Sequence, residues 1–232
     1  MRALLDAHYF LLMDHPAQHP LYALSERHEE AASALTHGLG VLASVAGTAV
    51  LVGLATLHGD GRQLAGALVF GLSLLALYTA STLYHAVRRE LAKARLQIVD
   101  HCAIYVLIAG TYTPFTLGPL HGGWGWSLFG VIWGLALAGI VFKLFFTGRF
   151  TRLSTALYVA MGWLVLVAAG PLVRAVPIET LAWLFAGGVA YTAGTFFYLS
   201  RRVPFGHAVW HLFVLGGSAC HFVAVFSIVG TG

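Results

Sequence analysis

Apolar residues along this chain gather in long runs, separated by short stretches that carry charged, glycine or proline residues. Each run is about as long as the roughly 20 apolar residues that a helix needs to cross a bilayer. The runs are too long, and alternate too weakly, for barrel strands. The pattern predicts an all-α fold, an integral membrane bundle of seven transmembrane helices. The expected spans are about 35–57, 64–87, 98–118, 124–146, 153–174, 180–200 and 207–229.

A more polar stretch precedes the first of these runs. We expect residues 1–34 to form a cytoplasmic N-terminal lead and residues 35–232 to form the transmembrane domain. Asp6, Asp14 and several histidines interrupt the apolar stretch of the lead, and no small-residue cleavage site follows it, so it does not have the pattern of a signal peptide. A short interfacial helix over 3–13 is an open alternative for part of the lead.

Composition narrows the class of protein. Of the 232 residues, 59% are hydrophobic and only 9% are charged, against roughly 25% charged in an ordinary soluble domain. So few charges cannot cover a water-soluble globule, which excludes that class. The two cysteines, Cys102 and Cys220, lie inside apolar runs, which excludes a disulfide framework and a cysteine-based zinc finger. We expect both to act as small hydrophobic residues.

The positive charges indicate an orientation in the membrane. If the N-terminus and the second, fourth and sixth loops share a side, that side carries eleven of the 13 Lys and Arg residues, and the other side carries only Arg62 and Arg174. The positive-inside rule then places the N-terminus in the cytoplasm and the C-terminus outside. We expect a multi-pass protein of the cell (inner) membrane. Its basic residues mark one side of the bilayer, so the expected partners are membrane lipids and not nucleic acid.

A few polar residues lie inside the predicted spans, where ionisable groups are costly and indicate function. Ser81 and His85 are four residues apart and share one face of the second span. Asp100 lies near the start of the third span. His207 and His211 begin the seventh span with the i, i+4 spacing of a two-histidine metal clamp.

Topology brings these five residues to one membrane depth. The span with Ser81 and His85 ends at the cytoplasmic side, while the spans with Asp100 and with the two later histidines begin there. The five side chains can therefore meet. The reverse direction for any one span would separate its residues from the others by about 30 Å of bilayer.

Three neutral imidazoles with one open position are typical of a catalytic zinc site. We therefore expect Zn²⁺ as cofactor, with His85, His207 and His211 as ligands. Zinc would lower the pKa of a bound water towards about 7. Asp100 would hold or deprotonate that water, or orient a ligating histidine. Ser81 could hydrogen-bond the water or a developing oxyanion.

Other polar residues have two readings. Glu29 and Glu30 near the cytoplasmic mouth are either a solvated helix start or part of the site. His37, like His58, His101 and His121, lies near the end of a predicted span. We expect these histidines to pack rather than to ligate a metal. His221 follows His211 by ten residues, so it could line the same cavity about 15 Å deeper.

Taken together, these motifs resemble a known family. They are Glu29-Glu30 before Thr36-His37-Gly38, Ser81-x-x-x-His85, Asp100 followed by Gly110-Thr-Tyr-Thr-Pro114, and His207-x-x-x-His211 with His221-Phe222. The chain resembles the bacterial hemolysin III family, a branch of the progestin and adipoQ receptors that is distantly related to alkaline ceramidases. The resemblance runs from about Glu29 to the C-terminus. It departs at Ser33, where asparagine is expected.

The resemblance implies seven helices with a cytoplasmic N-terminus, and zinc held by His85, His207 and His211 with Asp100 contacting a water on the zinc. We expect a metal-dependent hydrolase of a lipid-like amide or ester, with a role in membrane lipid homeostasis. One alternative is a non-catalytic sensor of membrane state or receptor-like regulator with structural zinc. Pore formation or transport is a third reading, less favoured because only His221 approaches the middle of the membrane.

Overall fold

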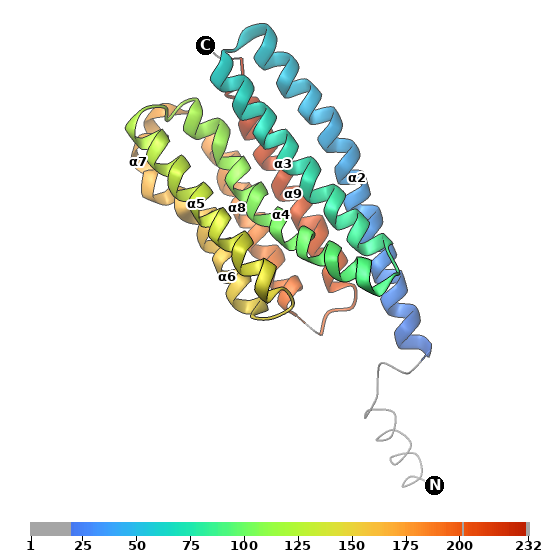
Figure 1. The fold of residues 1–232 in the computed structure, drawn as a ribbon. Coiled ribbons are helices and arrows are strands. Elements are labelled where there is room, and N and C mark those ends of the chain that lie inside the picture. The colour runs from blue at the N-terminus through green and yellow to red at the C-terminus, as the bar shows by residue number, and fades with distance from the viewer. Residues whose placement is uncertain (1–19, 201, 231–232) are drawn as a thin grey trace, which may run out of the picture.

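The described part of the chain, residues 20–200 and 202–230 of a computed structural model, consists of helices joined by short loops (Figure 1). Seven helical segments in it are long and apolar enough to cross a membrane, which confirms the predicted fold class and a multi-pass membrane protein. Residues 1–19 of the predicted lead, which include the alternative helix over 3–13, lie outside the described residues. The helices are α2 (Pro20–His58), α3 (Gly61–Ala86), α4 (Glu90–Leu117), α5 (Gly123–Phe146), α6 (Thr151–Gly162), η2 (Trp163–Ala168), α7 (Ala169–Ala175), α8 (Ile178–Leu199) and α9 (Gly206–Phe226).

Helix α2 is longer than the predicted first span. It begins at Pro20 and not near residue 35, and it has 39 residues, about 58 Å of helix against a hydrocarbon core of about 30 Å. Proline is favoured at a first helical position, and residues 21–34 contain good helix formers and no glycine. Polar residues end the apolar run there, but they do not end the helix. The extension carries Glu29 and Glu30 at the mouth of the bundle.

The fifth span, predicted as one helix over 153–174, is broken. It consists of α6, the 3₁₀ segment η2 and α7. The hydroxyl of Tyr112 on α4 lies at the break, 2.8 Å from the Met161 carbonyl oxygen, and it accepts a hydrogen bond of 2.8 Å from the Val165 amide. A helix can be irregular inside a membrane where a neighbouring helix satisfies the freed backbone groups. Tyr112 supplies such a partner.

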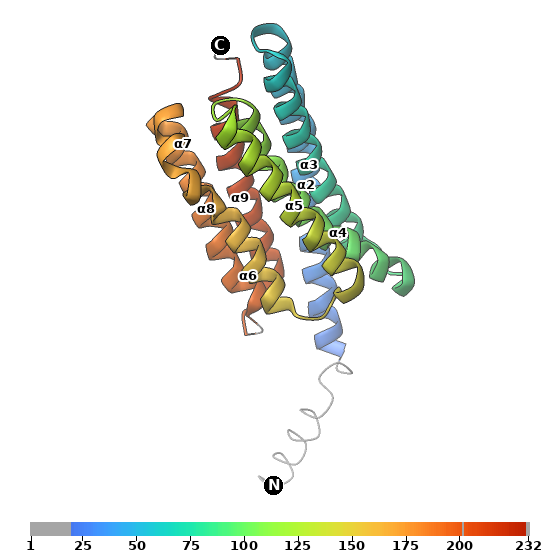
Figure 2. The same ribbon diagram turned by 60° about the vertical axis from the view of Figure 1, so that its left-hand side comes forward.

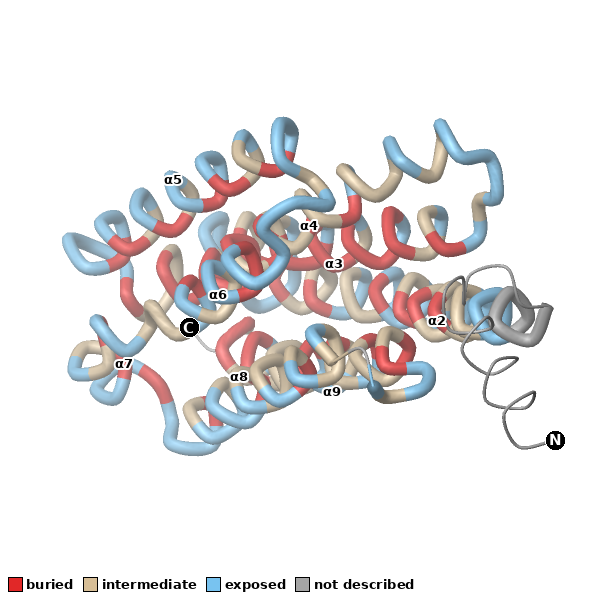
Figure 3. The backbone as a smooth tube through the Cα atoms, turned by 90° about the horizontal axis from the view of Figure 1, so that it is seen from below, coloured by how far each residue is buried: buried red, intermediate tan, exposed pale blue. Residues whose placement is uncertain are grey.

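The helices are arranged as a ring around a shared interior. Helices α2, α3, α4 and α5 pack in series, α8 packs on α9, and α9 packs back on α2. In the broken span α6–η2–α7, which lies beside α8 in Figure 2, α6 contacts α4, α5 and α8 more sparsely. Seen from below, the buried residues lie mainly on the inward sides of the helices and the exposed residues on the outward sides (Figure 3). Leucine, valine and phenylalanine side chains are common among the exposed residues, as expected where the surrounding solvent is lipid.

Local signals fix where α3 begins and how closely it meets α4. Asp60 caps α3 by accepting hydrogen bonds from the amides of Arg62 and Gln63, at 2.9 and 2.8 Å. The hydrogen bond from the Gln63 amide lowers the pKa of Asp60 below its usual value and outweighs the effect of desolvation, and the hydrogen bonds from Arg62 lower the pKa further. Further along, a Cβ on Gly66 would lie 2.8 Å from the Cα of Pro114. Only glycine permits α3 and α4 to approach so closely.

Candidate metal centre

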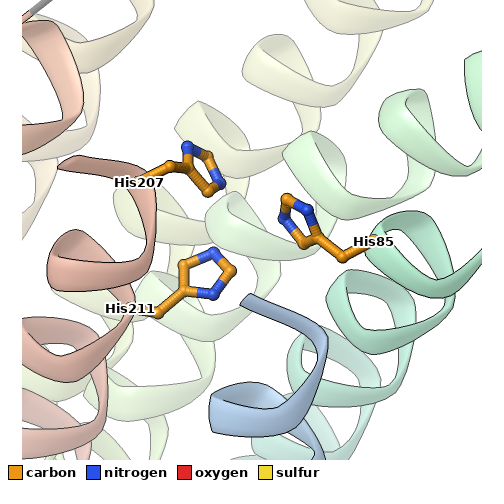
Figure 4. A group of neighbouring side chains, drawn as sticks. All are labelled: His85, His207 and His211. Atoms are coloured by element: carbon orange, nitrogen blue, oxygen red, sulfur yellow. The ribbon is translucent and has the colours of Figure 1, made fainter. Parts of the chain in front are cut away.

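Three histidines meet at the end of the bundle where α3 ends and α9 begins (Figure 4). His85 lies in the last turn of α3, and His207 and His211 lie in the first two turns of α9. One ring nitrogen from each lies within 4.8 Å of the other two. The centroid of the His85 ring lies 4.9 Å from that of His207 and 5.0 Å from that of His211. This group could hold a metal ion, and it comprises the histidines that the depth of the spans predicted.

The hydrogen bonds of His85 test whether the residues fit a metal. Its Nδ1 lies 3.0 Å from the Glu30 carboxylate, which can only accept, so Nδ1 carries the proton. Its Nε2 is buried and has no hydrogen-bond partner among the described residues. A buried polar atom left without a partner is costly. A metal ion among the three rings would satisfy that lone pair, so the residues fit a metal.

His211 is held in the corresponding way by the backbone of α2. Its Nδ1 lies 3.2 Å from the carbonyl oxygen of Ser33 and 3.5 Å from the Thr36 hydroxyl. The Nδ1–H donates to the carbonyl, which leaves Nε2 free as a ligand. Ser33 is the position at which the resemblance leads us to expect asparagine. Its contact with His211 uses the main chain and does not depend on which side chain stands there.

Glu29 and Glu30 contact the cluster, which favours the second of the two readings given above. Glu30 joins His85 to Lys93, whose Nζ lies 2.6 Å from the same carboxylate oxygen. Glu29 accepts a hydrogen bond of 2.9 Å from the backbone amide of His207. The sequence left the role of both residues open between a solvated helix start and part of the site. The signal that would have found them is helical continuity from Pro20, which places both residues on the same helix as Ser33.

His37 packs against the cluster without belonging to it. Its ring stacks on His211, with centroids 3.5 Å apart and planes 10° from parallel, and meets Tyr78 edge-on at 5.0 Å. Both of its ring nitrogens are buried without a hydrogen-bond partner among the described residues. His101 is occupied elsewhere, since its Nδ1 lies 2.8 Å from the Gln97 carbonyl oxygen. Neither histidine lies in the metal-competent group.

A cavity of about 580 Å³ opens beside the histidines. Ser81 and Asp100 line it at the histidine end, together with His207 and His211. Both side chains are buried. The structure thus places all five predicted site residues at one end of the bundle.

The remainder of the cavity is lined mainly by apolar side chains of α4, η2, α7 and α8, and it extends past Phe115. Phe115 lies fifteen positions after Asp100 on α4, which corresponds to about 22 Å of helix axis, more than the roughly 15 Å of hydrocarbon in one leaflet. His221 also lines it, as the sequence suggested, and its Nε2 lies 3.2 Å from the Leu184 carbonyl oxygen. Cys102 and Cys220 are both free.

Comparisons with known proteins give a consistent result. Residues 25–222 match the family model described as Haemolysin-III related. The Hemolysin-3 homolog of Bacillus subtilis is 49% identical over 197 residues, covering 85% of this chain and 92% of that protein. Hemolysin-3 of Bacillus cereus is 45% identical over 87% of this chain and 92% of its own length. The human Monocyte to macrophage differentiation factor is 29% identical over 86% of this chain and 84% of its own length. No solved structure shows significant similarity.

Proposed function

Because this chain belongs to the Haemolysin-III related family and brings three buried histidines to the end of an apolar cavity, we propose that it is a zinc-dependent hydrolase of a lipid-like amide or ester. It acts in the cell (inner) membrane, at the cytoplasmic leaflet, with a role in membrane lipid homeostasis. The observation that carries the proposal is the position of Asp100 and Ser81, which line the cavity at its histidine end.

The histidines would hold the ion through the Nε2 atoms of His85 and His211 and through a ring nitrogen of His207. Zinc is the default metal for an all-imidazole donor set. Bound there, it supplies Lewis acidity and a water of lowered pKa. Three protein ligands leave one position open, as in catalytic rather than structural zinc sites.

Asp100 and Ser81 would carry the proton and the developing charge. The Asp100 carboxylate accepts a proton from the attacking water and returns it to the leaving nitrogen or oxygen, so that an amide yields a carboxylic acid and an amine. The Ser81 hydroxyl donates a hydrogen bond to the oxyanion that forms from the carbonyl. Both side chains are buried, which excludes bulk water and strengthens each interaction.

The apolar cavity would hold the acyl chain. An apolar wall that begins at the polar residues and continues for about 22 Å suits a long single chain whose carbonyl lies at the histidine end. The bundle leaves the span α6–η2–α7 loosely packed between α5 and α8, a side from which a lipid could reach the cavity within the membrane.

The test is fatty acid release from a panel of amide and ester lipids by protein in lipid nanodiscs, measured by mass spectrometry. We expect Asp100→Asn and Ser81→Ala to lower the rate at least a hundredfold. Asp60→Asn is the matched control, because Asp60 is exposed at the opposite end of α3 and asparagine caps a helix equally well. Zinc-loaded protein that releases no fatty acid from any lipid in the panel would contradict the proposal.

A second candidate function is a membrane-state sensor in which zinc only braces the bundle. It is supported by the fact that the ligands come from two helices, so that a metal would link α3 to α9 next to the N-terminal part of α2. This function predicts that Asp100→Asn leaves the effect of the protein on membrane fluidity and lipid composition in cells unchanged. The hydrolase predicts that the same variant abolishes that effect.

A further inference from the structure

Glu30 on α2 connects a candidate metal ligand on α3 to a lysine on α4. One of its carboxylate oxygens lies 3.0 Å from His85 Nδ1 and 2.6 Å from Lys93 Nζ. We propose that Glu30, held by Lys93, is a positioning residue that selects the tautomer and the orientation of His85. The inference rests on the metal site of the proposed function but not on turnover.

The tautomer follows from the chemistry of the contact. An ionised carboxylate has lone pairs and no proton, so it can only accept a hydrogen bond from an imidazole. Lys93 Nζ donates to the same carboxylate oxygen at 2.6 Å. His85 therefore carries its proton on Nδ1, and its metal-binding lone pair lies on Nε2, the nitrogen that is buried without a partner among the described residues. A carboxylate that orients a ligating histidine also makes the imidazole more basic, and therefore a stronger ligand for the metal.

Lys93 fixes the carboxylate relative to the end of α3. Its ammonium also donates to the carbonyl oxygen of Tyr84 at 3.2 Å and lies 4.6 Å from the centre of the Tyr84 ring. Tyr84 is the residue next to His85, so the lysine links Glu30 to the backbone that carries the ligand. The side chains of Glu30 and Lys93 are 37% and 30% exposed, and ion pairs this exposed contribute little to folding stability. The expected effect is therefore on the site.

His85 needs such support more than the other two ligands do. His207 and His211 are one turn apart on α9, so the helix itself sets their spacing. His85 comes alone from α3, one residue before that helix ends at Ala86, and residues 87–89 are not helical. Its position relative to the other ligands depends on contacts with neighbouring helices. In the described residues, the side-chain hydrogen bond of His85 is the one to Glu30.

The first test reads the tautomer without metal. Nitrogen-15 NMR of the metal-free, histidine-labelled protein, with His85 assigned from a His85→Gln variant, distinguishes the two ring nitrogens. We expect the Nδ1–H form in the wild type and a shift towards the Nε2–H form in Glu30→Ala. Glu26→Ala is the matched control, because Glu26 is an exposed glutamate on the same helix, and it should leave the spectrum unchanged.

The second test is zinc affinity by chelator competition in detergent. We expect Glu30→Ala to weaken zinc binding about 10- to 100-fold and Lys93→Met to weaken it less. The two controls, Lys93→Arg and Glu26→Ala, should stay within about threefold of the wild-type affinity. Because Lys93→Met removes only the support of the carboxylate, it keeps the test decisive if Glu30→Ala does not fold.

Two results would overturn the inference. One is an unchanged His85 tautomer in Glu30→Ala, and the other is wild-type affinity in Glu30→Ala or, where that variant does not fold, in Lys93→Met. A wild type that binds zinc but hydrolyses no lipid would end the hydrolase proposal and leave the positioning role standing. A wild type that binds no zinc would end both.

Discussion

The imidazole rings of His37 and His211 lie face to face, with centroids 3.5 Å apart and planes 10° from parallel. His211 is a candidate metal ligand, whereas His37 lies outside the metal-competent group. The side of the His211 ring that faces α2 is therefore covered by another ring. This contact restricts how far the ligand can turn about its side-chain bonds.

Replacing His37 separates stacking from any chemistry of its ring nitrogens. His37→Ala removes the stacked ring and should weaken zinc binding about three- to tenfold, because such ring pairs contribute about 0.5–1.5 kcal/mol. His37→Phe keeps a flat ring and should bind zinc within about twofold of wild type. Chelator competition measures both. Equal losses in the two variants would show that the imidazole nitrogens matter and that stacking does not.

Glu29 stabilises the start of α9 by accepting the amide hydrogen of His207. The first amides of a helix have no partner within the helix, and a carboxylate there also interacts favourably with the helix dipole. Glu29→Ala should lower the free energy of unfolding by about 1 kcal/mol. Thermal unfolding in detergent measures the change against Glu26→Ala. If the two variants unfold alike, the contact contributes nothing to stability.

Tyr112 stabilises the break in the fifth span. Tyr112→Phe removes the hydroxyl that accepts from the Val165 amide and contacts the Met161 carbonyl oxygen. Loss of a partner for a buried backbone group costs about 1–3 kcal/mol. We expect a lower unfolding midpoint and faster hydrogen exchange confined to residues 162–168. The control is Tyr198→Phe. Among the described residues, the Tyr198 hydroxyl contacts only His101, at 3.4 Å, so its loss should leave exchange in residues 162–168 unchanged.

Zinc should stabilise the folded bundle by mass action. A ligand that binds only the native state contributes about 2.7 kcal/mol when present at 100 times its Kd. Added zinc should therefore raise the unfolding midpoint of metal-stripped wild type and should have no such effect on His211→Ala. Differential scanning fluorimetry in detergent with buffered zinc makes the comparison. A rise of equal size in both proteins would place the stabilising ion elsewhere.

Much of the fold followed from the apolar runs, because a helix in lipid must be long, apolar and internally hydrogen-bonded. Hydropathy misplaced the start of α2, since Glu29 and Glu30 end an apolar run while the helix continues through them. It also predicted an unbroken fifth span. The hydroxyl that contacts the break comes from Tyr112, about 50 residues away in the sequence, so the local sequence does not show this partner.

The candidate site could be located from the sequence because transmembrane topology converts order along the chain into depth. Span direction alone placed His85 and His207 at one end of the bundle, where the structure has them. The contacts of Glu30 were beyond this reasoning. They need the rotation of α2 about its axis, which is set by packing against α3 and α9. The roles assigned to Asp100 and Ser81 stay predictions.

The central claim is that His85, His207 and His211 hold a zinc ion. Its most direct test is the metal content of detergent-purified protein by elemental mass spectrometry. Wild type is compared with His85→Ala, His207→Ala and His211→Ala, and His101→Ala is the control, because its ring is held by the Gln97 carbonyl. We predict about one zinc per chain in the wild type and the control, and loss in each of the other three. No metal in a wild type purified without chelators, or zinc retained by all three variants, would contradict the claim.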